Sequence, residues 1–243
     1  MTRRWTRWAR TLAVALAVSL ALAAPGGGDD YEAQRRSMVE LQLRPRGITQ
    51  PEVLAAMMQV PRHLFVPESQ KSVAYEAQPL SFGAGRTIYE PYVVALMTQL
   101  LGLKRGDRVL EVGTGSGYHA AVLSRIAREV YSVEIVEPVG RQAAKRLEVL
   151  GYHNVEVRIG DGYQGWPDKM PFDAILLSAA PKEIPKPLLN QLRVGGKMVV
   201  PVGGFFQDLL VITKTADGLE RRTVIPVRLL PMKGKAQNGE KKR

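Results

Sequence analysis

The run VLEVGTGSGYHAAVL, from Val109 to Leu123, constrains the fold of this chain more than any other segment. A short apolar run ends in Gly113, Gly115 and Gly117, and helix-forming residues follow at once. Glycine permits a sharp backbone turn and a close ligand approach because it carries no Cβ. A strand, a glycine turn and a helix in this order are typical of α/β domains that bind nucleotides or nucleosides.

Short apolar runs and helical patterns alternate from Arg108 onward, which predicts an α/β fold with a Rossmann-like, doubly wound and mostly parallel sheet. Asp217-Gly218 is a hairpin signal between two further apolar runs and predicts antiparallel strands at the C-terminal end. We expect strands at 108–112, 130–135, 155–159, 172–178, 197–201, 209–214 and 222–227, and helices at 118–128, 139–150 and 186–192.

The segment before the sheet is expected to be mainly helical, with helices at 31–43, 50–59 and 92–101. Between the second and third of these helices, Ser81–Pro91 is expected to be a glycine-rich loop. We divide the chain into a signal segment (1–24), a spacer (25–35), an N-terminal helical and substrate-loop region (36–106), a cofactor-binding core (107–231) and a basic tail (232–243).

The first 24 residues have the pattern of a secretory signal: an arginine-rich start, the apolar run Leu12–Ala24 and small residues near Ala23. The apolar run is shorter than the roughly 20 residues that a membrane-spanning helix needs. We therefore predict cleavage near Ala23 or Ala24 and a periplasmic or secreted protein, without stable membrane association unless the segment stays uncleaved. Translation from Met38 would instead leave the protein in the cytoplasm.

The formal net charge of +11 is concentrated at the two ends of the chain. No basic stripe with interleaved aromatic residues crosses the middle, so we expect no nucleic-acid partner. We also expect the protein to be a monomer. The absence of cysteine excludes thiolate chemistry, and three histidines without paired spacing predict no metal site. The basic residues at the ends are Arg3, Arg4, Arg7, Arg10, Lys233, Lys235, Lys241, Lys242 and Arg243.

Acidic residues accompany three successive predicted strands. Glu111 precedes the glycine turn, Glu134 ends the next strand, and Asp161 follows the third. Glu111 disfavours a pyrophosphate and favours a cation, Glu134 is placed for a ribose diol, and Asp161 is placed for an adenine amino group. Spacing alone leaves a dinucleotide open, because a looser fingerprint from Gly115 to Ala120 is met. The charges favour S-adenosylmethionine, which carries a sulfonium and an ammonium.

Six segments resemble one family within the class I S-adenosylmethionine-dependent methyltransferases. They are VPRHLFVP (60–67), the GxGxTI loop (83–88), PYVVALMT (91–98), VGTGSGY (112–118), GDGYxGW (160–166) and PFDA (171–174). These motifs resemble the protein-L-isoaspartate O-methyltransferases, and the resemblance covers about 36–231. It implies methyl transfer from S-adenosylmethionine to the free carboxylate of L-isoaspartyl and D-aspartyl residues in damaged proteins, which is the first step of their repair.

The resemblance implies two sets of site residues. Thr87, Ile88 and their neighbours form the substrate loop, and Glu111, Gly113, Gly115, Glu134, Asp161 and Gly162 bind the cofactor. We add Thr114, Ser116, Gly117 and Ile135 as cofactor contacts beside them, Ser178 as pocket lining after the fourth strand, and Gln207 as a residue that reaches the cofactor. No catalytic histidine or metal is required, because a carboxylate is already an anion at neutral pH.

The substrate loop departs from the family pattern at two positions. Tyr89 stands where a serine is usual, and Arg86 stands where a glutamine is usual. We expect Arg86 to pair with the substrate carboxylate. Tyr89 and Thr87 are the candidate catalytic residues. The Tyr89 phenol either donates a hydrogen bond to the substrate or obstructs the pocket. The alternatives are a methyltransferase of this fold with another carboxylate or small-molecule substrate, or a non-catalytic binder of cofactor or peptide.

Overall fold

The computed structural model describes residues 27–83 and 85–238 and contains a seven-stranded sheet in the order β5-β4-β3-β6-β7-β8-β9. The first five strands in this order are parallel, and β8 and β9 are antiparallel. This confirms the predicted fold class. The strands are β3 (Arg108–Val112), β4 (Glu129–Glu134), β5 (Val155–Ile159), β6 (Phe172–Leu177), β7 (Leu192–Gly203), β8 (Gln207–Thr215) and β9 (Gly218–Val227).

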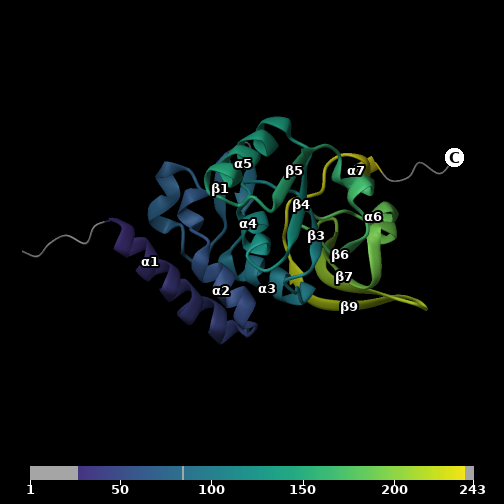
Figure 1. The fold of residues 1–243 in the computed structure, drawn as a ribbon, viewed down its shortest axis with the longest axis horizontal. Helices are drawn as coiled ribbons and strands as arrows, with labels where there is room; N and C mark the ends of the chain where they lie inside the picture. Colours follow the sequence, from purple (N-terminus) through teal and green to yellow (C-terminus); the bar gives the residue numbers. More distant parts are fainter. Residues whose placement is uncertain (1–26, 84, 239–243) are drawn as a thin grey trace, which may run out of the picture.

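Helices cover both faces of the sheet (Figure 1). The N-terminal helices, with α3 and α4, pack on one face around Val109, Ala174 and Val199, while α6 and the C-terminal segment pack on the other face around Leu110 and Ile175. Alternate residues of the central strands therefore enter two separate apolar cores. The helices are α1 (Gly27–Ser37), α2 (Pro51–Gln59), α3 (Pro91–Leu101), α4 (Tyr118–Ser124), α5 (Glu137–Val149), α6 (Lys186–Gln191) and α7 (Lys235–Asn238).

The N-terminal region contains more regular secondary structure than the sequence pattern predicts. Helix α1 begins at Gly27, inside the expected spacer, and continues into a π-helical turn at Met38–Leu43. The expected loop before α3 contains an antiparallel pair, β1 (Leu80–Gly83) and β2 (Arg86–Ile88). Such a short pair lacks the apolar alternation from which strands are predicted.

Two elements of the sheet region also differ in length from their prediction. Helix α4 ends at Ser124, and the Asn154 side-chain amide donates to the carbonyls of Ser124 and Ala127, which satisfies backbone groups that the helix leaves without a partner. Strand β7 begins at Leu192, well before the apolar run, and so takes the end of the predicted helix 186–192 into the sheet. Its pairing with β6 at this end is irregular.

The start of the expected basic tail is packed against the domain. Met232 is buried, and so is Ala236 within α7. The backbone N–H of Lys235 donates to Asp161 Oδ2 at 2.9 Å, which attaches this segment to the loop after β5. The predicted boundary at Pro231 therefore does not mark the end of the ordered domain.

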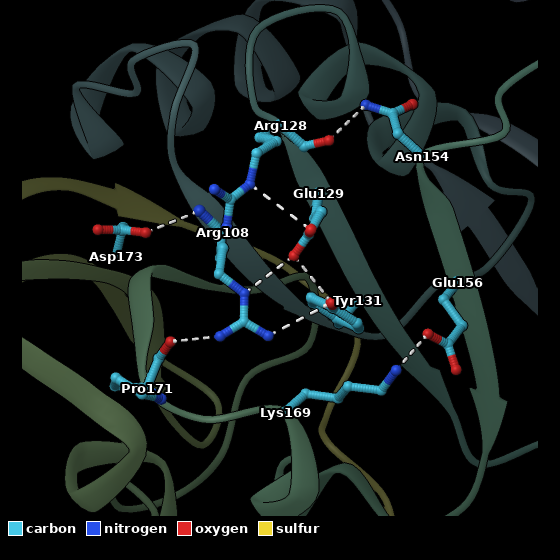
Figure 2. Close-up of polar contacts among 9 residues, drawn as sticks. All are labelled: Arg108, Arg128, Glu129, Tyr131, Asn154, Glu156, Lys169, Pro171 and Asp173. Carbon is cyan, nitrogen blue, oxygen red and sulfur yellow. Dashed lines mark hydrogen bonds and ion pairs between the residues drawn. The ribbon is translucent and has the colours of Figure 1, made fainter.

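A polar network joins β3, β4 and β6 at their amino-terminal edge, opposite the glycine turn (Figure 2). Arg108 Nε donates to Glu129 Oε2 at 2.9 Å, and the Arg108 backbone N–H donates to Asp173 at 2.8 Å. Arg108 also contacts the Tyr131 hydroxyl at 3.3 Å. This edge is thus occupied by structural ion pairs, whereas the opposite edge is open for a ligand.

The predicted signal segment lies outside the residues that the structure describes. Among the described residues, no helix is both long and apolar enough to span a membrane.

Candidate functional site

A cavity lies at the carboxyl edge of the sheet, between the ends of β3 and β6. The strand order reverses here, since β4 and β5 extend from one side of β3 and β6 and β7 from the other. Open α/β sheets bind ligands at such a point. The glycine turn, residues 86–89 (the β2 loop, which contains the predicted substrate loop) and the C-terminal segment 230–233 together line the cavity.

The glycine turn adopts the conformation that its sequence predicts. Gly113, Gly115 and Gly117 have φ angles of 101°, 55° and 87°, a region that L-residues with side chains rarely adopt. The Gly113 N–H donates to Val133 O at 2.8 Å, so the turn is held against β4. Gly117 directly precedes α4 and does not itself line the cavity, whereas Thr114, Gly115 and Ser116 do.

Glu111 is fully buried beneath the glycine turn. Ser132 Oγ donates to its Oε2 at 2.6 Å and is itself 2.6 Å from Thr114 Oγ1. Its other oxygen, Oε1, and the nearby Ser178 Oγ have no well-formed hydrogen bond among the described residues, although the Ser178 hydroxyl is close enough to Glu111 to oppose the rise in its pKa. Burial raises the pKa of Glu111 to about 8 against the opposing effect of Ser132, so the side chain is mostly uncharged at neutral pH.

Glu134 and Asp161 are both fixed by backbone N–H groups. Glu134 lines the cavity, and its two oxygens accept from Gly115 and Val136 at 3.0 Å each. Asp161 accepts from Tyr163 and Lys235 at 2.9 Å each and does not line the cavity, although Gly162 does. The predicted ribose contact is therefore compatible with the geometry, whereas an adenine contact of Asp161 stays a prediction.

Strand β2 contributes Arg86, Thr87 and Ile88 to the cavity wall. The Arg86 Nε is buried and has no hydrogen-bond partner among the residues described. Burial raises the pKa of the Tyr89 hydroxyl, and the positive charge of Arg86 opposes this rise. A buried N–H of a guanidinium without a partner is costly, and a bound carboxylate would satisfy it.

Tyr89 lines the cavity but is engaged by backbone groups. Its hydroxyl donates to Ser178 O at 2.8 Å and accepts from the Leu230 N–H at 3.1 Å. Burial raises the pKa of Tyr89 to about 12, so the phenol stays protonated. The single hydroxyl hydrogen is thus already used, and the expectation that Tyr89 donates to the substrate is not met. Tyr89 instead joins the β6 end to the C-terminal segment.

Replacing Tyr89 with phenylalanine should lower the free energy of unfolding by about 1–3 kcal/mol, because a carbonyl and an N–H would lose their partner. Urea denaturation measures this change, with Tyr92→Phe on α3 as the matched control. An activity loss at unchanged stability would contradict the structural role and restore Tyr89 as a substrate donor.

Three site residues were not predicted from the sequence. Arg62 is fully buried and donates from Nη2 to the backbone carbonyl of Tyr89 at 2.8 Å, which holds the backbone of the substrate loop in place. Ser132 links Glu111 to Thr114. His119 lines the cavity, and burial lowers its pKa to about 3, so it is neutral. For these three buried polar residues, the only signal in the sequence is that each stands within or beside an apolar run.

The His119 ring is oriented by the neighbouring helix. Thr98 Oγ1 donates to Val94 O at 2.8 Å and lies 3.0 Å from His119 Nε2. A hydroxyl has only one hydrogen, so in the arrangement in which Thr98 donates to Val94 O, the His119 tautomer with its hydrogen on Nε2 donates to Thr98 Oγ1.

Gln207 does not reach the cavity. Its side chain accepts from the Leu229 N–H at 2.8 Å and donates to Leu229 O at 3.0 Å. The described residues contain no cluster of three or more side chains suited to a metal ion. The predicted site residues that line the cavity are Arg86, Thr87, Ile88, Tyr89, Gly113, Thr114, Gly115, Ser116, Glu134, Ile135, Gly162 and Ser178.

Comparison with known proteins relates most of the chain to one family. The family profile of Protein-L-isoaspartate(D-aspartate) O-methyltransferase matches residues 33–237. A protein-L-isoaspartate O-methyltransferase of Picosynechococcus sp. is 52% identical over 206 residues, covering 85% of this chain and 93% of the relative. A protein-L-isoaspartate O-methyltransferase 1 of Cupriavidus necator is 47% identical over 236 residues, covering 92% of this chain and 91% of the relative.

Two solved structures have a similar fold. A protein-L-isoaspartate O-methyltransferase superimposes with a TM-score of 0.76 at 30% identity, covering 82% of this chain and 66% of that longer chain. A Plasmodium falciparum protein assigned as a protein-L-isoaspartate O-methyltransferase, solved with S-adenosyl-L-homocysteine, superimposes with a TM-score of 0.70 at 24% identity. The second comparison supports the fold alone.

Proposed function

Because this chain belongs to the protein-L-isoaspartate(D-aspartate) O-methyltransferase family, we propose that its cavity combines a cofactor part on the glycine turn with a substrate part on the β2 loop. The protein is an S-adenosylmethionine-dependent methyltransferase that acts on isoaspartyl residues of damaged proteins. One cavity lined by both the glycine turn and Arg86, Thr87 and Ile88 is the structural observation that supports this division.

The residues beneath the glycine turn fit the cofactor. Ser178 lines the cavity and lies beside the buried Glu111, and neither Ser178 Oγ nor Glu111 Oε1 has a well-formed hydrogen bond, so a cationic amino acid moiety would supply a donor at this position. Glu134 lines the cavity with both carboxylate oxygens anchored, each with a lone pair left for a ribose hydroxyl. When bound, S-adenosylmethionine supplies a methyl group on a positively charged sulfur.

The protein's own residues bind and orient the substrate carboxylate and do not deprotonate it. A carboxylate is already ionised at neutral pH, so no general base is needed. Arg86 is placed to hold the carboxylate, and the buried Ile88 and the partly buried Tyr89 exclude water from around it. Removing water and fixing the approach of the carboxylate are the principal contributions available to this site.

A methyl-transfer assay tests the function. The purified protein should form a methyl ester on an isoaspartyl peptide, with labelled S-adenosylmethionine as donor, and none on the same peptide with a normal aspartyl linkage. Cofactor binding without transfer would indicate a non-catalytic binder. Transfer to another carboxylate compound and not to the isoaspartyl peptide would indicate a different substrate.

We also propose that the protein is exported to the periplasm or secreted and acts as a monomer, without nucleic acid and without stable membrane association after cleavage. The secretory pattern of residues 1–24 and the location of the net charge at the ends of the chain support this proposal. Sequencing the mature N-terminus and sedimentation analysis test it. A mature protein that begins at Met38 would contradict export.

A further inference from the structure

Two adjacent aromatic side chains are exposed at the turn between β7 and β8. Phe205 and Phe206 are 82% and 86% exposed, and their rings form an edge-to-face pair with centroids 5.1 Å apart. Large apolar residues that stay this exposed, side by side, are candidates for contact with another molecule. Strand β7 runs parallel to β3 and β6, so this turn lies at the same carboxyl edge of the sheet as the cavity.

The base of the turn is fixed to the segments that wall the cavity. The Gly203 N–H donates to Pro181 O at 3.0 Å, just beyond the cavity-lining Ser178 and Ala179. The Gln207 side chain pairs with both backbone groups of Leu229, next to the cavity-lining Leu230.

The turn also depends on glycine at its first position. Gly203 has a φ of 136°, and a Cβ there would lie 2.1 Å from Phe206 O. Only glycine therefore permits the tight turn that presents the two rings. A fixed base and exposed aromatic tips are suited to binding a partner with little loss of conformational entropy.

We propose that Phe205 and Phe206 bind apolar side chains flanking the isoaspartyl residue of the polypeptide substrate. This inference rests on the proposed function. A damaged polypeptide whose carboxylate enters the cavity continues over the carboxyl edge, where the aromatic turn meets its neighbouring residues. Apolar flanks are favoured because burying a large apolar side chain is favourable, whereas glycine and serine offer little surface. The turn thus adds a preference for damaged segments that carry aromatic or aliphatic residues.

Two isoaspartyl peptides that differ only in their flanking residues test this proposal. The apolar peptide has phenylalanine and leucine at the flanks, and the polar peptide has glycine and serine. The double variant Phe205→Ser/Phe206→Ser should raise KM for the apolar peptide about tenfold. Its kcat and its KM for the polar peptide should stay unchanged. The control Leu41→Ser/Val149→Ser replaces residues that are 72% and 74% exposed elsewhere and should leave both peptides unaffected.

Equal changes in KM for both peptides, or none, would overturn the proposal. If the pair instead joins two copies of the chain, sedimentation would show self-association that the double variant loses while KM stays constant, and this too would overturn it. The wild-type assay separates this test from the proposed function, because a protein that methylates neither peptide fails at that earlier step.

Discussion

A Glu111→Gln variant should bind S-adenosylmethionine about 10- to 100-fold more weakly than the wild type, because a hydrogen bond to a charged group contributes about 1.5–3 kcal/mol. Glutamine has nearly the shape of glutamate but cannot become a carboxylate beside a cation. Isothermal titration calorimetry measures the dissociation constant. Glu220→Gln, at an exposed carboxylate on β9, is the control and should leave it unchanged.

The raised pKa of Glu111 gives this variant a second signature. At pH 7 the buried side chain is mostly protonated in the free protein, so binding a cation should release a proton. Titrations in two buffers of different ionisation enthalpy should detect this release in the wild type and not in Glu111→Gln. A variant that binds the cofactor as tightly as the wild type would show that Glu111 has only a structural role.

Folding stability should follow the same titration. The pKa of Glu111 is about 8 in the folded protein, above the ordinary carboxyl value of 4.5, so the folded state holds a proton that the unfolded state releases. The resulting stabilisation is complete below pH 4.5 and is lost as pH rises through 8. Glu111→Gln should therefore be similar to the wild type in stability at pH 4 and become progressively more stable than the wild type as the pH rises from 4.5 to 8.

The sheet was predictable because its central strands are buried on both faces and form nearly continuous apolar runs. The bounds of β3 and β5 match their predicted ranges, and the glycine turn has the conformation that its spacing indicates. The β1–β2 pair was not predictable, since four- and three-residue strands have too little pattern to distinguish them from a loop.

The state of individual site residues was less predictable, because it depends on burial and on distant backbone groups. The sequence indicates a negative charge at Glu111, but burial leaves the free side chain mostly protonated. Tyr89 bonds to Ser178 and Leu230, which are 89 and 141 residues away in the sequence. Arg62 is buried without a carboxylate partner in the structure described, which no local pattern indicates.

Replacing Arg86 with glutamine should lower kcat/KM for an isoaspartyl peptide about 10- to 100-fold, because a bidentate, charge-assisted pair with the substrate carboxylate would be lost. The dissociation constant of S-adenosylmethionine should not change, since Arg86 belongs to the substrate loop and the cofactor part lies on the glycine turn. Arg86→Lys should recover only part of the activity, because lysine keeps the charge but lacks the planar fork.

Arg105→Gln is the matched control for this substitution. Arg105 is exposed and precedes β3, at the sheet edge opposite the cavity, so its loss changes the net charge equally without altering the site. Steady-state kinetics with the peptide, together with calorimetry for the cofactor, separate the outcomes. Equal losses in Arg86→Gln and Arg105→Gln would mean that only long-range charge matters. Weakened cofactor binding in Arg86→Gln would place Arg86 in the cofactor part of the cavity and leave the substrate carboxylate without its proposed partner.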